Sequence, residues 1–122
     1  MTSVTVTALD GIVVADFSRV LAGPYATMML GDLGAQVHKV ERPGVGDDTR
    51  RWGPPYAENG QSTYFQSINR NKDCLALDLH SDTGVTQARE LIRRSDVVIE
   101  NFKTGTMARL GLDYDTLAVD QP

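Results

Sequence analysis

Four short apolar runs predict four buried strands. The runs lie at about Ile12–Phe17, Val37–Val40, Cys74–Leu79 and Val97–Glu100. The first is almost wholly apolar, as expected for a strand that is covered on both faces. The third alternates leucine with alanine and aspartate, which predicts a strand with one face better buried.

A helix is predicted between the first two strands. Pro24 suits the first helical position, where a missing N–H costs nothing. Apolar side chains then recur at helical spacing, and Gly34 closes the helix as a C-terminal glycine. This spacing predicts that the buried face carries Tyr25, Met28, Met29 and Leu33.

Further helices are predicted along the rest of the chain. Ser81 or Asp82 can cap a helix whose apolar stripe includes Val85, Ala88 and Leu91. Shorter helices are expected at Ser62–Ile68, with Ser62 as N-cap, at Met107–Leu110 and at Tyr114–Val119.

The alternation of strands and helices predicts an α/β fold with a Rossmann-like parallel sheet flanked by helices. Residues 1–122 can form one compact unit. A long irregular loop at about residues 43–62 interrupts the rhythm. Such loops are usually functional or disordered, and Trp52 and Tyr56 favour a function or packing onto a partner.

Candidate binding residues follow the first two strands. Ligands of open α/β sheets sit beyond the carboxyl ends of parallel strands, where Arg19, Glu41 and Arg42 fall. The glycines of this region do not form G-x-G-x-x-G, which argues against the common dinucleotide-binding fold. Glu41 could hold a ribose, but a guanidinium directly after it favours a phosphorylated ribose. Alternatively, Glu41 and Arg42 only pair with each other at a solvated strand end.

The charge balance argues against a nucleic-acid partner. The chain has 12 basic and 16 acidic residues, a net charge of −4, whereas nucleic-acid binders usually carry a basic excess on one face. The basic residues from Arg42 to Lys72 alternate with acidic ones, which predicts a solvated loop. No apolar run approaches the roughly 20 residues of a membrane span, so no membrane partner is expected.

The single cysteine predicts a reducing compartment and a cytoplasmic location, because no intramolecular disulfide is possible. Residues 1–7 lack the basic and apolar regions of a signal peptide. Cys74 is predicted to be a buried, unreactive thiol in a strand. His38 and His80 lack partners at ligand spacing, so no metal site is expected.

Several segments together resemble the class III coenzyme A-transferases, such as formyl-CoA and carnitine CoA-transferases, and the related α-methylacyl-CoA racemases. The resemblance runs from Leu9 to about Leu117, and members of the family are considerably longer. The chain is therefore similar to the N-terminal part of their large domain. The segments that carry the resemblance are Asp16–Pro24, Val40–Pro43, Gly46–Arg50, Trp52–Pro55, Asn69–Lys72 and Val98–Phe102.

This resemblance implies that the chain binds coenzyme A (CoA) or an acyl-CoA as substrate, without a tightly bound cofactor. Arg42 would face the adenosine end of CoA, and Arg109 would offer a cation to a phosphate. His80 stands where the family often has lysine. The implied CoA contacts are Arg19, Leu21, Ala22, Arg42, Leu77, Asp78, Leu79, His80, Asn101, Phe102, Lys103 and Arg109.

The resemblance also implies the reaction, which moves CoA from a thioester to a carboxylic acid. The family uses an aspartate nucleophile that forms a mixed anhydride with the acyl group. That aspartate would lie past Pro122, so no catalytic residue is expected here, and Asp16 and Asp96 are interpreted as structural. The whole protein would be an interlocked homodimer, and this chain alone is expected to be inactive.

Two other functions remain open at this point. A racemase would need a general acid–base pair, which would also lie beyond this chain. Asn69–Lys72 and Glu100–Phe102 favour the transferase. The third possibility is a non-catalytic nucleotide-binding or assembly module.

Overall fold

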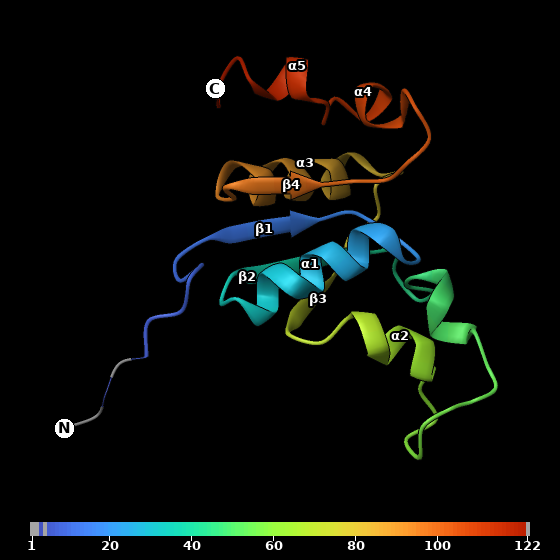
Figure 1. Ribbon diagram of the computed structural model, residues 1–122. Coiled ribbons are helices and arrows are strands. Elements are labelled where there is room, and N and C mark those ends of the chain that lie inside the picture. Colours follow the sequence, from blue (N-terminus) through green and yellow to red (C-terminus); the bar gives the residue numbers. More distant parts are fainter. Residues whose placement is uncertain (1–2, 4, 122) are drawn as a thin grey trace.

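A sheet of four parallel strands forms the centre of the computed structural model, which describes residue 3 and residues 5–121. The strands are β1 (Val13–Asp16), β2 (Gln36–Glu41), β3 (Lys72–Ala76) and β4 (Val97–Ile99). Their spatial order is β3-β2-β1-β4 (Figure 1). All three neighbouring pairs are parallel, so the predicted α/β class and its parallel sheet are confirmed.

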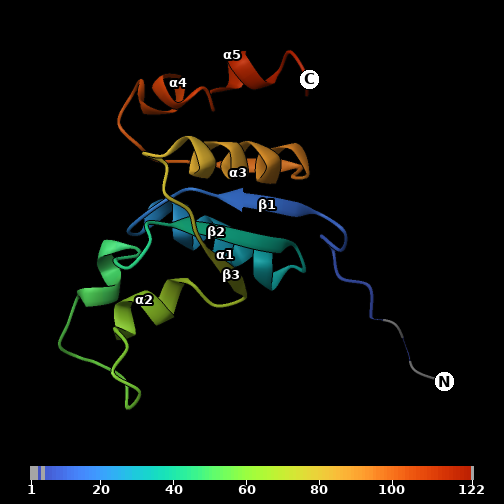
Figure 2. The ribbon, with the colours of Figure 1, turned by 180° about the vertical axis from the view of Figure 1, so that it is seen from behind.

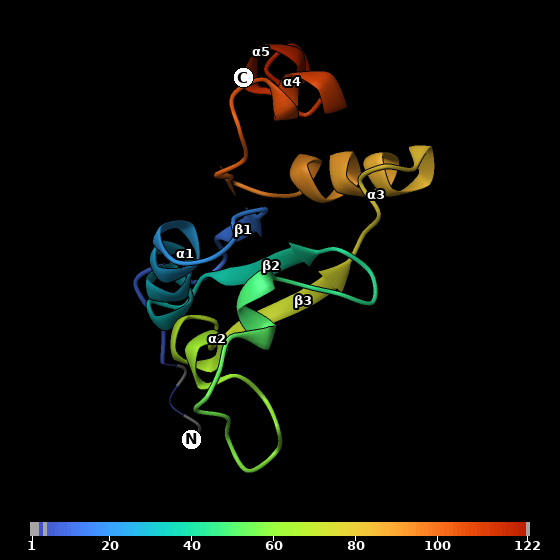
Figure 3. The ribbon, with the colours of Figure 1, turned by 90° about the vertical axis from the view of Figure 1, so that its right-hand side faces the viewer.

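Helices cover both faces of this sheet. The elements are α1 (Ala22–Asp32), the 3₁₀ helix η1 (Asp48–Arg51), α2 (Thr63–Ile68), α3 (Asp82–Arg93), α4 (Thr106–Leu110) and α5 (Tyr114–Leu117). Helix α1 lies in front of the strands in Figure 1, and α3 lies on the opposite side in Figure 2. Figure 3 shows the two helices on either side of the strands, with α4 and α5 beyond α3.

The core has two layers, one on each face of the sheet. Neighbouring residues of β1 belong to different layers, because successive side chains of a strand point to opposite faces. Val14 packs with Val37 against Leu30 of α1. Ala15 belongs to the larger cluster on the other face, which contains Leu91 of α3. That cluster also includes Phe17, Val40, Ala88, Ile92, Met107 and Leu112.

Helix α1 confirms the predicted C-terminal glycine but changes the predicted start. Gly34 adopts a φ of 104°, which favours glycine. The helix begins at Ala22, two residues before Pro24. Proline is still accommodated in this first turn, because the N–H groups there have no partner within the helix.

The predicted buried face of α1 is wrong. Met28 is buried, but Tyr25, Met29 and Leu33 are each about half exposed. The helix instead buries Thr27, whose hydroxyl donates to the Asp16 carboxylate at 2.6 Å. A polar bond to the end of β1 therefore helps to orient the helix, together with the apolar contacts of Met28 and Leu30.

The edge strand β3 departs from its predicted bounds and from the predicted burial of its cysteine. β3 begins at Lys72 and ends at Ala76, because the chain turns away at Asp78 to enter α3. Cys74 of this edge strand is exposed, so its predicted burial is wrong. Partial burial of its sulfur, together with Glu41, raises the pKa of Cys74 to about 11. The thiol is therefore protonated at neutral pH, as in an unreactive cysteine.

The predicted helix caps are confirmed by hydrogen bonds. The hydroxyl of Ser62 accepts from the Phe65 N–H at 3.2 Å, and that of Ser81 accepts from the Gly84 N–H at 3.0 Å. Within the described part of the chain, no helix is both long and apolar enough to cross a membrane. The segment analysed for a signal peptide lies partly outside the described residues.

We predict that Gly84→Ala destabilises the fold. A Cβ at Gly84 would lie 1.8 Å from the carbonyl oxygen of Asp78, which is backbone and cannot rotate away. Overpacking of this kind typically costs about 1–3 kcal/mol, more than the roughly 1 kcal/mol by which alanine favours a helix. The measurement is the free energy of unfolding in urea.

Gly31→Ala in α1 is the matched control. Its added Cβ would meet the carbonyl oxygen of Asn71 at 3.1 Å, a tight contact that a small shift relieves. We expect a much smaller loss than for Gly84→Ala. Equal stability of wild type and Gly84→Ala would contradict the close approach between α3 and the turn at Asp78.

Candidate functional site

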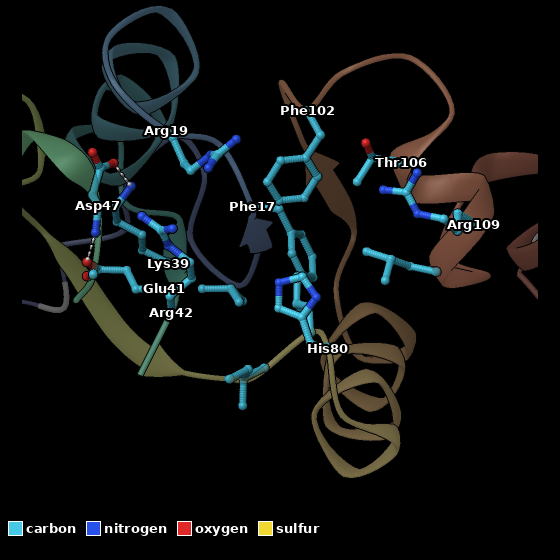
Figure 4. A pocket seen from close by; sticks show the side chains of 15 residues that line it. Phe17, Arg19, Lys39, Glu41, Arg42, Asp47, His80, Phe102, Thr106 and Arg109 are labelled. Carbon is cyan, nitrogen blue, oxygen red and sulfur yellow. Dashed lines mark hydrogen bonds and ion pairs between the residues drawn. The ribbon is translucent and has the colours of Figure 1, made fainter. Parts of the chain in front are cut away.

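One cavity gathers residues from the carboxyl ends of all four strands. Its apolar lining comes from Phe17, Val40, Leu77, Leu79, Phe102 and Leu110, and its polar lining from Arg19, Lys39, Glu41, Arg42, Gly46, Asp47, His80, Thr106 and Arg109. Figure 4 shows Arg19 and Arg42 on one side of the cavity and Arg109 on the other. This is the place that parallel α/β sheets use for ligands.

The structure brings together seven of the twelve binding residues named from the sequence. These are Arg19, Arg42, Leu77, Leu79, His80, Phe102 and Arg109. The other five do not line the cavity. Leu21, Ala22 and Lys103 are exposed beside it, Asp78 accepts a hydrogen bond from the His80 N–H, and Asn101 binds the backbone of Arg19.

The three arginines of the cavity differ in their partners. Arg19 lies 5.1 Å from the ring centroid of Phe102. Among the described residues, neither Arg19 nor Arg109 forms an ion pair. Arg42 Nη2 lies 2.8 Å from Asp48 Oδ1. Both side chains are about half exposed, so this ion pair contributes little to stability. All three guanidinium groups can therefore accept an anionic ligand.

A buried ion pair that the sequence analysis missed joins β2 to the following loop. Lys39 Nζ lies 2.9 Å from Asp47 Oδ2, and neither side chain is exposed to solvent. The ammonium group also donates to the Ser18 carbonyl at 3.0 Å. Thr49 donates to the other carboxylate oxygen through both its N–H and its hydroxyl. The loop after β2 is thus attached to the end of β1.

Glu41 is also part of this framework. Its carboxylate accepts two hydrogen bonds from Arg50, at 2.6 and 2.7 Å, and one from the Asp47 N–H. Burial opposes ionisation, but these bonds outweigh it and keep the pKa of Glu41 below its usual value. Glu41 therefore pairs with Arg50, and Arg42 pairs with Asp48, so the alternative in which Glu41 and Arg42 pair with each other is wrong.

A second buried pair confirms the structural interpretation of Asp16. Its carboxylate lies 3.2 Å from Lys72 Nζ, and both side chains are fully buried. Lys72 also donates to the Pro24 carbonyl and to the Asn69 side chain. Asp96 is structural too, because its carboxylate accepts from the Val13 N–H at the start of β1.

Most of the loop after β2 is exposed, as its alternating charges predicted, but its middle part is not. Asp47 and Thr49 are buried, and η1 lies within the loop. Arg50 stacks on the ring of Phe65, 3.9 Å from the centroid. One signal could have indicated this arrangement: Lys39 lies in an apolar strand, where a lysine requires a buried partner.

No cluster of His, Cys, Asp and Glu that could hold a metal ion occurs among the residues described here. The chemistry that the cavity offers is that of arginine guanidinium groups, an imidazole and apolar walls. These groups suit a ligand that combines anionic groups with an aromatic or apolar part.

Comparison with known proteins assigns the chain to a family. The sequence model of CoA-transferase family III matches residues 9–122. The chain therefore belongs to this family. It is 52% identical to the succinyl-CoA:glutarate CoA-transferase of Mus musculus, over 89% of this chain and 25% of that protein. It is 44% identical to the acetyl-CoA:oxalate CoA-transferase of Acetobacter aceti, over 93% and 28%.

A solved structure has the same fold. A CAIB/BAIF family protein from Brucella suis superposes with a TM-score of 0.87 at 46% identity, over 93% of this chain and 30% of that protein. The chain thus spans between a quarter and a third of the length of these relatives.

We predict that Lys39→Met destabilises the protein strongly. The substitution leaves Asp47 buried and without its cation, and breaking such a pair typically costs about 3–5 kcal/mol. Arg42→Met is the matched control, because it removes a half-exposed ion pair worth at most about 1 kcal/mol. Urea unfolding of both variants measures the difference. A loss for Lys39→Met no larger than for the control would show that the pair is dispensable.

Acid is expected to unfold the protein partly through Asp47 and Glu41. Burial raises the pKa of Asp47, but hydrogen bonds from Lys39 and Thr49 outweigh it, so the folded-state pKa is lowered, as for Glu41. Their contribution is fully present above the unfolded pKa values of about 3.9 and 4.3, and it is lost as pH falls through the lower folded values.

The free energy of unfolding should therefore decrease below about pH 5. In Asp47→Asn, the free energy of unfolding should decrease less steeply with falling pH than in wild type, because one of the two linked carboxylates is gone. Asp115→Asn, on exposed α5, should keep the wild-type slope. Urea unfolding between neutral and acidic pH measures the slopes, and identical slopes for wild type and Asp47→Asn would contradict the linkage.

Proposed function

We propose that this chain is the CoA-binding part of an acyl-CoA:carboxylate CoA-transferase. The observation that carries the proposal is the cavity at the strand ends, where three arginines surround apolar walls. CoA is a polyanion with an aromatic base and therefore combines the two kinds of group that this lining suits. Membership of CoA-transferase family III supports the same ligand.

Different residues of the cavity are proposed to bind different parts of CoA. Arg42 would pair with the phosphate on the ribose, while Leu77, Leu79 and His80 would contact the adenosine end. Arg19 and Arg109 would bind other anionic groups of CoA. Each of these side chains lines the cavity. Leu21, Ala22, Asp78 and Lys103 do not line the cavity but are exposed, so a long ligand such as CoA can still reach them.

The complete protein is proposed to transfer CoA between a thioester and a carboxylic acid, with both as its substrates and CoA not retained as a tightly bound cofactor. The names of the relatives favour this reaction over racemisation, because both are CoA-transferases. No residue of this chain is proposed to act as the nucleophile or as an acid–base group in the reaction. Its single cysteine is compatible with the reducing cytoplasm.

A homodimer is proposed for the complete protein. Tyr25 and Met29 of α1 lie four residues apart, its cap residues Leu21 and Leu33 continue the same spacing at either end, and each of the four is about half exposed. Four such side chains on one helix face form an apolar surface of the kind that is usually covered in an assembly. We propose that this surface is covered in the complete dimeric protein.

The test is CoA binding by Arg42→Ala in the complete protein that contains this chain. If Arg42 pairs with the ribose phosphate, the variant loses a charge-assisted bond of about 1.5–3 kcal/mol, which corresponds to roughly a ten- to hundredfold weaker affinity for CoA. Dephospho-CoA lacks this phosphate, so its affinity should change little. Isothermal titration calorimetry measures both ligands.

Arg51→Ala is the matched control, because Arg51 is an exposed arginine of η1 that does not line the cavity. It should bind CoA like wild type. Equal losses of CoA and dephospho-CoA affinity in Arg42→Ala would show that Arg42 does not contact the phosphate. Failure of the wild-type protein to bind CoA would disprove the proposed function.

A further inference from the structure

The turn between β1 and α1 is held by side chains from β2, from the loop after β2 and from the segment after β4. Lys39 donates to the Ser18 carbonyl at 3.0 Å, and Asp47 accepts from the Val20 N–H at 3.3 Å. Between them, the Asn101 amide makes two bonds to Arg19. Its oxygen accepts from the Arg19 N–H at 2.9 Å, and its nitrogen donates to the Arg19 carbonyl at 2.7 Å.

The conformation of this turn needs such support. Val20 has a φ of 72°, in the left-handed region that β-branched residues rarely adopt. A conformation of this kind persists only where surrounding contacts determine it. The strained residue directly follows Arg19, so the bonds that maintain the turn also fix where the Arg19 side chain begins.

The Arg19 side chain extends from this held backbone toward the ring of Phe102, the residue after Asn101 (Figure 4). Asn101 therefore joins the carboxyl ends of β1 and β4 at the point where both contribute to the cavity. Each half of its amide already has a partner, and Asn101 does not line the cavity. Direct ligand binding through this amide would require breaking those bonds.

We propose that Asn101 is a positioning residue that holds Arg19 in its ligand-binding orientation, so that Asn101 affects CoA affinity through Arg19. This inference rests on the proposed function. It replaces the direct CoA contact that the family resemblance implied for the Asn101 side chain.

A double-mutant cycle in the complete protein tests the proposal. The proteins are wild type, Asn101→Ala, Arg19→Ala and the double variant, and the measurement is the CoA dissociation constant by calorimetry. Arg19→Ala should weaken binding about tenfold or more, as for loss of a charge-assisted bond. Asn101→Ala should weaken it severalfold, and the double variant should bind like Arg19→Ala alone.

This coupling separates positioning from other roles. If Asn101 contacted CoA directly, the fold-losses of CoA affinity in Asn101→Ala and Arg19→Ala would multiply in the double variant. This result would overturn the inference. An unchanged affinity in either single variant would overturn it as well, while the proposed function would stand. Absence of CoA binding by folded wild type would instead remove the proposed function and the inference together.

Stability is controlled separately, because Asn101→Ala also removes bonds that support the fold. Urea unfolding should show the same loss from Asn101→Ala in the presence and absence of the Arg19 side chain, since the bonds involve only the Arg19 backbone. If Asn101→Ala does not fold, Asn101→Ser is used, because it replaces the amide with a neutral hydroxyl and adds no charge beside the cavity. It should show a smaller loss of affinity that again disappears in the Arg19→Ala background.

Discussion

The buried lysine–carboxylate pairs at the ends of β1 and β2 determine the architecture of the site. Lys39 with Asp47 and Lys72 with Asp16 are both fully buried. A charge that is removed from water must find its partner and its remaining hydrogen bonds within the protein. Satisfying these two lysines attaches the loop after β2, the start of α1 and the end of α2 to the strands. Of these segments, the loop after β2 contributes Gly46 and Asp47 to the cavity lining.

The same pairs explain why the cavity is basic although the chain is acidic overall. The carboxylates of Asp16 and Asp47 are neutralised by these lysines, and that of Glu41 at the end of β2 is neutralised by Arg50. Arg19 and Arg109 have no carboxylate partner among the described residues and retain their charge for a ligand. The net charge of −4 therefore describes the surface as a whole and does not describe this cavity.

Features that depend on neighbouring residues could be predicted from the sequence, and features that depend on distant partners could not. The strands, the serine caps and Gly34 follow from local spacing and backbone preference. The orientation of α1 depends on a hydrogen bond between Thr27 and Asp16, and Cys74 is exposed because β3 is an edge strand. Neither the sheet order nor the pairing of Lys39 with Asp47 has a local signature.

The held turn at Arg19 connects the framework to binding. A flexible arginine loses side-chain entropy when it binds an anion, and this loss reduces affinity. At Arg19 the backbone is already fixed by Asn101, Lys39 and Asp47, and the side chain is directed toward Phe102. In the proposed function, the backbone of Arg19 would then need no further ordering when a ligand binds. The strain at Val20 is maintained by the same bonds, so folding supplies the preorganisation and ligand binding does not have to create it.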